Sequence, residues 1–301
     1  MQSFWDVDPT KIEEVFLPSV IKCDVRLFIK RDDLIHPFVS GNKWRKLKYN
    51  LIEAKKRGFS QVLTFGGAFS NHIYSSAYAI EEAGMSSIGV IRGEELNTSN
   101  FTLNFASSHG MKFHFLDRSS YRNKYSFDVL SELKSIYGDF FLIPEGGSNE
   151  FAVEGVGEML DELTDDYSHI CCACGTGGTL AGIANKSTSQ LIIGFPVLKN
   201  GEFLKADIDN LIDKDTDYHL ACGYHFGGYA KINRDLVIFM DDFYAATNIQ
   251  LDPVYTAKMM YGVIKEIENG NIPSGSRVLA IHTGGLQGLE GMRNKMDRLR
   301  G

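Results

Sequence analysis

Hydrophobic and polar positions along the chain fall into short apolar runs that alternate with longer amphipathic stretches. Short apolar runs bounded by polar or glycine residues predict buried strands, and apolar residues spaced three and four apart predict helices. The predicted strands are 25–30, 61–65, 87–91, 112–116, 140–143, 169–174, 191–195, 218–222 and 278–281. Helices are predicted after residues 40, 72 and 179, and at 98–108, 126–137, 151–163, 203–212, 236–245 and 255–268.

The alternation of strands with helices is typical of parallel sheets joined by helical crossovers. Several of the predicted strands run into paired glycines, which are Gly66-Gly67, Gly146-Gly147, Gly177-Gly178 and Gly284-Gly285. Ligands of open α/β sheets bind at the carboxyl ends of the strands, and glycine there lets the backbone approach a ligand closely. The repeated glycine pairs therefore predict a ligand site at the strand ends.

Charge and composition narrow the class of function. The chain has 31 basic and 38 acidic residues, and its net charge of −7 gives no electrostatic reason to expect nucleic acid or membrane as a partner. No apolar run approaches the roughly 20 residues that span a bilayer. The first residues lack the pattern of a signal peptide, so we expect a cytoplasmic location. The five cysteines form neither a disulfide framework nor a zinc pattern, and no metal is expected.

A lysine at the start of one predicted helix is a candidate nucleophile. Ser40 and Asn42 are helix-start residue types and Gly58 ends the run, which places Lys43 in or beside the first turn. A cation there opposes the helix dipole. A lysine that attacks a carbonyl, however, benefits from surroundings that lower its pKa. The alternative is an ordinary solvated surface lysine.

Two predicted strand-to-helix turns are candidate anion sites. The first is Gly175-Thr176-Gly177-Gly178-Thr179, whose N–H groups and hydroxyls are enough to hold one phosphate; a purely structural tight turn is the alternative. A dinucleotide fingerprint would need an acidic residue about 20 positions further on, but the first one is Glu202. The second is Ser70-Asn71-His72, where Ser70 either only caps a helix or also helps to hold a carboxylate. A hydrolase nucleophile elbow would need glycine at the positions of Ala68 and His72.

Together these segments resemble the family of 1-aminocyclopropane-1-carboxylate (ACC) deaminases and D-cysteine desulfhydrases, which use pyridoxal 5'-phosphate. The matching motifs, in the family's order, are Lys30-Arg31-Asp32-Asp33, Ser40-Gly41-Asn42-Lys43 with Arg45-Lys46-Leu47, Gly66-Gly67 with Ser70-Asn71-His72, the turn at 175–179, Asp252-Pro253-Val254-Tyr255 and His282-Thr283-Gly284-Gly285. The resemblance implies an α/β fold of two domains, each an open, mostly parallel twisted sheet with helices on both faces. It implies a large cofactor-binding domain at 1–45 plus 146–301 and a small inserted domain at 46–145.

The resemblance also implies how the cofactor would be held. Lys43 would form the Schiff base with the cofactor aldehyde, and Lys46 with the turn at 175–179 would hold the phosphate. Asn71 would contact the ring hydroxyl, and Tyr255 would pack on or beside the pyridine ring. The implied substrate-binding residues are Ser70, Asn71, His72 and Tyr224, and the implied catalytic residues are Lys43, Ser70 and Tyr255. Tyr224 is equally consistent with ordinary aromatic packing.

One departure from the ACC deaminases bears on the reaction. Those enzymes carry a glutamate near the pyridine nitrogen, directly after the tyrosine that corresponds to Tyr255, whereas this chain has Thr256. Thr283 would then be the partner of that nitrogen, as a neutral hydroxyl is in desulfhydrase-like members. A hydroxyl favours a protonated ring less than a carboxylate does. This favours expulsion of a good leaving group over the opening of a cyclopropane ring.

The sequence therefore predicts a pyridoxal-phosphate-dependent deaminating lyase of the D-cysteine desulfhydrase type. It would convert D-cysteine or another β-substituted D-amino acid to a 2-oxo acid and ammonia. The alternative reaction is ACC deamination to 2-oxobutanoate and ammonia. Alternatives from other classes are a protein that binds the cofactor without turnover and a dinucleotide-binding oxidoreductase. A small amino acid is the expected substrate, and a homodimer is the expected assembly.

Overall fold

The computed structural model describes residues 4–94, 100–163, 165–213 and 216–301. The strands are β1 (Ile12–Val15), β2 (Arg26–Lys30), β3 (Gln61–Gly67), β4 (Ser86–Arg92), β5 (Lys112–Leu116), β6 (Phe141–Ile143), β7 (His169–Cys174), β8 (Leu191–Pro196), β9 (Tyr218–Leu220) and β10 (Arg277–Ile281). The helices are α1 (Pro18–Lys22), α2 (Asn42–Lys56), α3 (Asn71–Glu82), α4 (Phe101–Ser108), α5 (Arg118–Arg122), α6 (Phe127–Tyr137), α7 (Glu150–Asp161), α8 (Gly178–Lys186), α9 (Leu204–Asp209), α10 (Arg234–Thr247), α11 (Thr256–Glu268) and α12 (Gly288–Arg300). Short 3-10 helices are η1 (Asp32–Leu34), η3 (Glu145–Gly147) and η4 (Gly201–Phe203).

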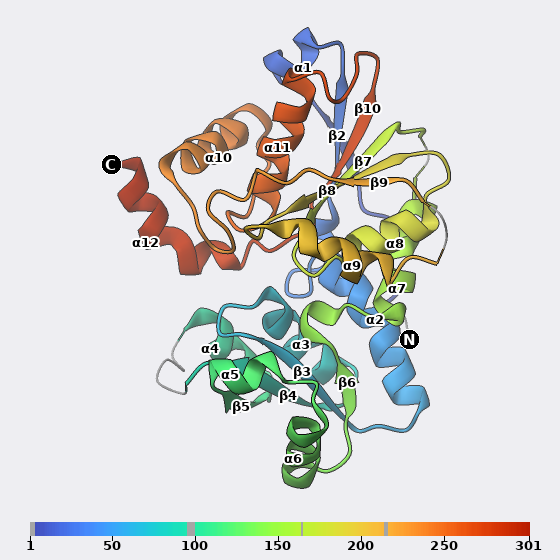
Figure 1. The fold of residues 1–301 in the computed structure, drawn as a ribbon, viewed down its shortest axis with the longest axis vertical. Helices are drawn as coiled ribbons and strands as arrows, with labels where there is room; N and C mark the ends of the chain where they lie inside the picture. The colour runs from blue at the N-terminus through green and yellow to red at the C-terminus, as the bar shows by residue number, and fades with distance from the viewer. Residues whose placement is uncertain (1–3, 95–99, 164, 214–215) are drawn as a thin grey trace.

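The described strands form two sheets, which lie in the upper and lower halves of Figure 1. The six-stranded sheet has the order β1-β2-β10-β7-β8-β9, and its neighbouring strands are parallel except for β1 against β2. The four-stranded sheet has the order β5-β4-β3-β6 and is parallel throughout. The predicted α/β class with two mostly parallel sheets is confirmed.

Strand periodicity explains how the six-stranded sheet is covered on both faces. Leu27 and Ile29 of β2 pack into one cluster with α1, α10 and α11, whereas Phe28 packs into another with α7, α8 and α9. Successive side chains of a strand point to opposite faces, so a strand buried on both sides is apolar throughout. The same rule divides the cysteines of β7, because Cys171 joins the first cluster and Cys172 the second. Both are free, buried thiols.

The structure corrects some of the predicted elements. The strand predicted at 218–222 ends at Leu220, and β1, α1, α5 and α12 were not predicted. In α12 only Met296 is buried, so its polar sequence carries a weak helical signal. Residues 98 and 99 of the helix predicted at 98–108 lie outside the described residues, and α4 begins at Phe101. The division into 1–45 plus 146–301 and 46–145 stays a prediction; the strands of the four-stranded sheet lie within 61–143.

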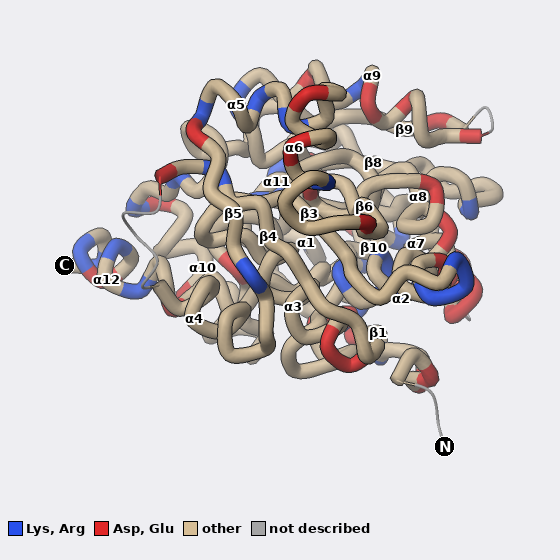
Figure 2. Tube along the Cα trace, turned by 90° about the horizontal axis from the view of Figure 1, so that it is seen from below, with Lys and Arg blue, Asp and Glu red and all other residues tan. Residues whose placement is uncertain are grey.

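Charges of both signs are interspersed along the chain. Figure 2 shows Lys and Arg alternating with Asp and Glu, for example along α12. Within the described ranges, no helix has both the length and the apolar character that crossing a bilayer requires.

The start of α2 is pressed against the carboxyl end of β10. Gly41 precedes α2 with φ +59°, and a Cβ at this position would lie 1.9 Å from the carbonyl oxygen of Thr283. The N–H of Asn42 donates to that same oxygen at 3.4 Å. Only glycine combines this backbone conformation with such a close approach. The helix that carries Lys43 is therefore seated directly on the turn that follows β10.

We predict that Gly41→Ala destabilises the protein by about 3 kcal/mol or more, because the new Cβ would force α2 away from Thr283. Gly58→Ala is the matched control, since Gly58 also has positive φ but has nothing within 4 Å of its added Cβ. Its expected cost is about 1–2 kcal/mol. Urea unfolding measures both values. Equal losses would show that backbone conformation alone, and not the contact with the turn, requires Gly41.

Candidate active site

The paired-glycine turns lie against residues that the sequence singled out. A Cβ added to a glycine would lie 2.9 Å from Ser70 Oγ at Gly66, 3.2 Å from His72 Cε1 at Gly147, 3.1 Å from Lys46 Nζ at Gly178, and 2.9 Å from Asn71 Nδ2 at Gly285. These glycines come from both sheets and are far apart in sequence. Their close contacts bring the predicted residues to the ends of the strands, as parallel α/β sheets favour.

The basic residues near the start of α2 lie on two sides of the helix. Lys43 and Lys46 are three residues apart and therefore neighbours on one face, whereas Arg45 points elsewhere. Arg45 donates to both carboxylate oxygens of Asp32, at 2.6 and 3.0 Å, and pairs with Glu162 at 2.8 Å. Burial would raise the pKa of Asp32, but the Arg45 guanidinium holds it below its usual value. This buried pairing fixes the rotation of α2.

Lys46 and the start of α8 form a cradle for an anion. The Lys46 side chain is buried, with the residue 2% exposed, and its ammonium donates to Ser148 Oγ at 3.1 Å. Ser148 shares a second hydrogen bond, at 2.6 Å, with Thr176. Helix α8 begins after Gly177 without a side-chain cap, so the N–H groups of its first turn need a partner. A buried cation, hydroxyls and free N–H groups together suit a phosphate.

Lys43 lies beside this cradle with a perturbed pKa. Its Nζ is 3.4 Å from Asn42 Oδ1, and the Asn42 amide donates to Thr179 Oγ1 at 2.8 Å, which ties the start of α2 to the first turn of α8. The side chain is partly exposed, yet the surrounding protein desolvates the ammonium enough to lower its pKa to about 8. Burial, with Lys43 adding to it, also lowers the pKa of Lys46. A neutral amine of Lys43 is the nucleophilic form.

Ser70 caps α3, which is one of the two roles that the sequence analysis offered for it. Its Oγ accepts from the N–H groups of His72 and Ile73, at 3.2 and 3.3 Å. The hydroxyl proton is not used in these bonds and remains available as a donor. A contact between Ser70 and a substrate carboxylate therefore remains a prediction that is compatible with the capping role.

His72 is turned into the protein instead of offering a free ring nitrogen. Its Nε2 is 2.7 Å from Thr64 Oγ1, and that hydroxyl donates to the carbonyl oxygen of Ile143, which assigns the proton to Nε2. Its Nδ1 is 3.4 Å from Ser76 Oγ. Burial, with the charges of Lys43 and Lys46, lowers the pKa of His72 well below its usual value. These contacts favour a neutral histidine that braces α3 over the predicted role in binding a substrate.

Tyr255 is positioned at the start of α11. Its backbone N–H donates to both carboxylate oxygens of Asp252, at 2.7 and 3.0 Å, and a Cβ at Gly175 would lie 3.1 Å from its ring. Burial raises the pKa of Asp252 to about 7, and desolvation also raises that of the Tyr255 hydroxyl.

The two threonines near this turn differ in their contacts. The hydroxyl of Thr256 accepts a hydrogen bond from the N–H of Asp252 at 2.8 Å, so it is engaged within the same turn. The carbonyl of Thr283 supports α2, and its side chain is largely buried.

The structure places Tyr224 away from this cluster and brings in Tyr229. The Tyr224 hydroxyl donates to Glu266, and its ring packs near Phe195. The ring of Tyr229 instead lies edge-on to that of Tyr255, with centroids 6.0 Å apart, and the two hydroxyls hydrogen-bond. These contacts of Tyr224 are the ordinary aromatic packing that the sequence offered as its alternative role, and substrate binding by Tyr224 stays a prediction. The pair Gly227-Gly228 before Tyr229 is the same signal that marked the other turns.

Comparisons with known proteins identify the family and the fold. Residues 7–197 match the family of pyridoxal-phosphate dependent enzymes. A Thermotoga maritima protein provisionally named 1-aminocyclopropane-1-carboxylate deaminase is 34% identical, over 89% of this chain and 91% of the relative. An Arabidopsis thaliana protein named bifunctional D-cysteine desulfhydrase/1-aminocyclopropane-1-carboxylate deaminase, mitochondrial, is 30% identical over 97% of this chain and 80% of its own. The crystal structure of an ACC deaminase homologue, 29% identical, matches with a TM-score of 0.85 and covers 96% of this chain and 93% of that one.

We predict that, without cofactor, Lys43 is acetylated with a pH midpoint near 8, because desolvation lowers its pKa and yields the neutral amine at lower pH. Acetylation by a limiting reagent, followed by mass spectrometry of the peptide that contains Lys43, measures the midpoint. The same peptide from the Lys43→Ala protein gives the background. A labelling rate still rising steeply above pH 10 would contradict the perturbed pKa.

Proposed function

This chain belongs to the family of pyridoxal-phosphate dependent enzymes, and from that premise we propose that it is a deaminating lyase acting on D-cysteine or another β-substituted D-amino acid. The observation that carries the proposal is the pairing of Lys43, an amine of lowered pKa, with the anion cradle around Lys46. The first suits an aldehyde and the second suits a phosphate, and pyridoxal 5'-phosphate carries both groups.

The residues present fit this cofactor. The buried ammonium of Lys46 has a hydroxyl partner, and none of the described carboxylates pairs with it, so a phosphate would supply the missing negative charge. Thr176, Thr179 and the first N–H groups of α8 would complete the phosphate site. We propose Lys43 for the aldehyde and Asn71 for the ring hydroxyl. Tyr255 would lie on or beside the ring, and Thr283 would meet its nitrogen.

The chain's own side chains then have separate tasks. Bound pyridoxal phosphate supplies an aldehyde for the amino group of the substrate and a ring that withdraws electrons from its α-carbon. The neutral amine of Lys43 takes the α-proton, which its lowered pKa makes feasible near neutral pH. The free hydroxyl proton of Ser70 binds the substrate carboxylate. Tyr255 stays protonated because its pKa is raised, so it can donate to a departing group together with Tyr229.

The choice of D-cysteine over ACC rests on the environment of the ring nitrogen. No glutamate follows Tyr255, and the hydroxyl of Thr256 is already engaged with the backbone of Asp252. A hydroxyl such as that of Thr283 makes the ring a milder electron sink, adequate for expelling thiolate. ACC deamination is the second candidate, because the Thermotoga maritima and Arabidopsis thaliana relatives carry that activity in their names.

The assembly and the location are part of the proposal. We propose a homodimer, which exposed aromatic side chains such as Phe69 and Phe127, 64% and 83% exposed, would help to form. The net charge of −7 is compatible with a cytoplasmic protein that binds neither nucleic acid nor membrane.

We predict that the protein with bound cofactor releases a 2-oxo acid from D-cysteine, or from another β-substituted D-amino acid, and that Lys43→Ala abolishes this release. A screen of D- and L-amino acids plus ACC with a 2-oxo acid assay measures it. Turnover of ACC alone would select the second candidate. A protein that binds the cofactor but releases no 2-oxo acid from any of these compounds would be a non-catalytic binder. Absence of the visible absorbance band of lysine-bound cofactor would refute the proposed cofactor chemistry.

We predict that Lys46→Met weakens cofactor binding by roughly 10- to 150-fold, because a charge-assisted contact to the phosphate is worth roughly 1.5–3 kcal/mol. Titration of the cofactor-free protein, followed by visible absorbance, measures the affinity. Lys56→Met is the matched control, since Lys56 lies on the same helix with its side chain 76% exposed. Unchanged affinity in Lys46→Met would show that the phosphate does not bind in the proposed cradle.

A further inference from the structure

A second buried lysine contacts the loop that carries Tyr229. Lys258 lies on α11, three residues after Tyr255, and is 1% exposed. Its ammonium donates to the backbone carbonyl oxygens of His225 and Gly228, both at 2.8 Å. Both partners belong to the loop at 223–229, which ends at Tyr229. A buried ammonium held by backbone carbonyls can fix the path of a loop without taking part in chemistry.

The loop needs such a restraint because its backbone is strained. Phe226 and Ala230 have φ values of 52° and 54°, in the left-handed region that side chains disfavour, while the glycines between them also have positive φ. Non-glycine residues remain in this region only where surrounding contacts hold them. The two carbonyls bound by Lys258 lie within this strained stretch or beside it.

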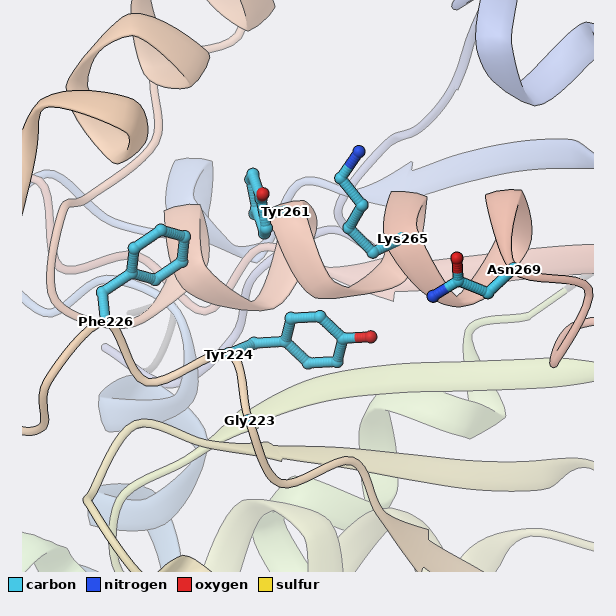
Figure 3. A pocket seen from close by; sticks show the side chains of 6 residues that line it. All are labelled: Gly223, Tyr224, Phe226, Tyr261, Lys265 and Asn269. Carbon is cyan, nitrogen blue, oxygen red and sulfur yellow. The ribbon is translucent and has the colours of Figure 1, made fainter.

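The other end of the loop is anchored on the same helix. Tyr224 and Phe226 point toward α11 and line a hollow of about 370 Å³ with Gly223, Tyr261, Lys265 and Asn269, as Figure 3 shows. The rings of Phe226 and Tyr261 meet edge-on at 4.9 Å, and the Tyr224 hydroxyl donates to Glu266. Aromatic packing therefore holds the start of the loop. Lys258 holds the part from which Tyr229 departs toward Tyr255.

We propose that Lys258 is a positioning residue: by binding the carbonyls of residues 225 and 228, it holds Tyr229 against Tyr255. The inference rests on the proposed function only for the kinetic role of Tyr229. The effect on the loop itself follows from the contacts and does not depend on which substrate is used.

Hydrogen exchange of the full chain with cofactor bound tests the loop directly. Lys258→Met removes both hydrogen bonds while keeping a similar length, and it should speed amide exchange at 223–230 by about tenfold or more. Lys186→Met is the control, because Lys186 ends α8, pairs with Asp161 at the surface and does not line the hollow beside the loop. It should leave loop exchange unchanged. Unchanged loop exchange in Lys258→Met would overturn the proposal whether or not the protein is an enzyme.

Kinetics test whether Lys258 acts through Tyr229. With the best substrate from the amino-acid screen, Lys258→Met should lower kcat by about tenfold or more, and Lys258→Arg, which keeps the charge, should recover part of the loss. In a Tyr229→Phe background the same change should lower kcat by less than about threefold, because the partner hydroxyl is already gone. Equal losses in both backgrounds would overturn the proposal, since they would show that Lys258 acts independently of Tyr229.

Folding of the variants provides a separate check. Lys258→Gln is the second neutral variant, and its amide can still donate to one carbonyl. If both neutral variants failed to fold, the proposal would be overturned, because the ammonium would then support the domain and not the loop alone. A thermal unfolding midpoint within a few degrees of that of Lys186→Met is the expected result for a residue whose role is local.

Discussion

The buried pairing of Arg45 with Asp32 and Glu162 is the constraint on which the site depends. Successive residues of a helix are rotated by about 100°, so a side chain locked on one side commits its neighbours to the others. With Arg45 engaged, Lys43 and Lys46 lie near each other on another side of α2, and Lys46 reaches Ser148 and the start of α8. Lys30 is fully buried and also pairs with Glu162, which extends the network to the six-stranded sheet. Removing one partner of such a buried pair typically costs about 3–5 kcal/mol.

On the opposite side of α2, Lys43 and Lys46 place two positive charges near each other. Burial lowers the pKa of both lysines, and the charge of Lys43 lowers the pKa of Lys46 further. The protein therefore holds a site that is short of negative charge. A phosphate at the start of α8 would favour the charged form of Lys46, whereas desolvation suits Lys43 to covalent chemistry. In the proposed site, the phosphate and the aldehyde of one cofactor would meet these two needs at adjacent positions.

Close backbone contacts join the parts of the chain that build the site. Gly41 lies on the carbonyl of Thr283, and Gly147 lies against His72. The turn after β10 thus supports the start of α2, while η3 contacts α3 within the half of the molecule that holds the four-stranded sheet. The loop at 223–229 adds Tyr229 from a third direction, held by side chains of α11. Residues from distant parts of the sequence therefore reach one site through contacts that allow no side chain larger than glycine at several positions.

The sequence by itself determined the alternation of strands and helices, the parallel α/β class and the glycine turns at the strand ends, because these follow from local periodicity and from the conformational freedom of glycine. The division into two sheets was implied only by the resemblance to a known family. It also singled out Lys43 and the turn at 175–179, whose chemistry is visible in their residue types. Only the tertiary structure decided that the ring nitrogens of His72 lie against the hydroxyls of Thr64 and Ser76. It also decided that Tyr229 lies beside Tyr255, and that Lys258 binds the loop at 223–229. The physical reason is that hydrogen-bond partners and ring contacts across long sequence separations are set by packing, which leaves no periodic signal in the chain.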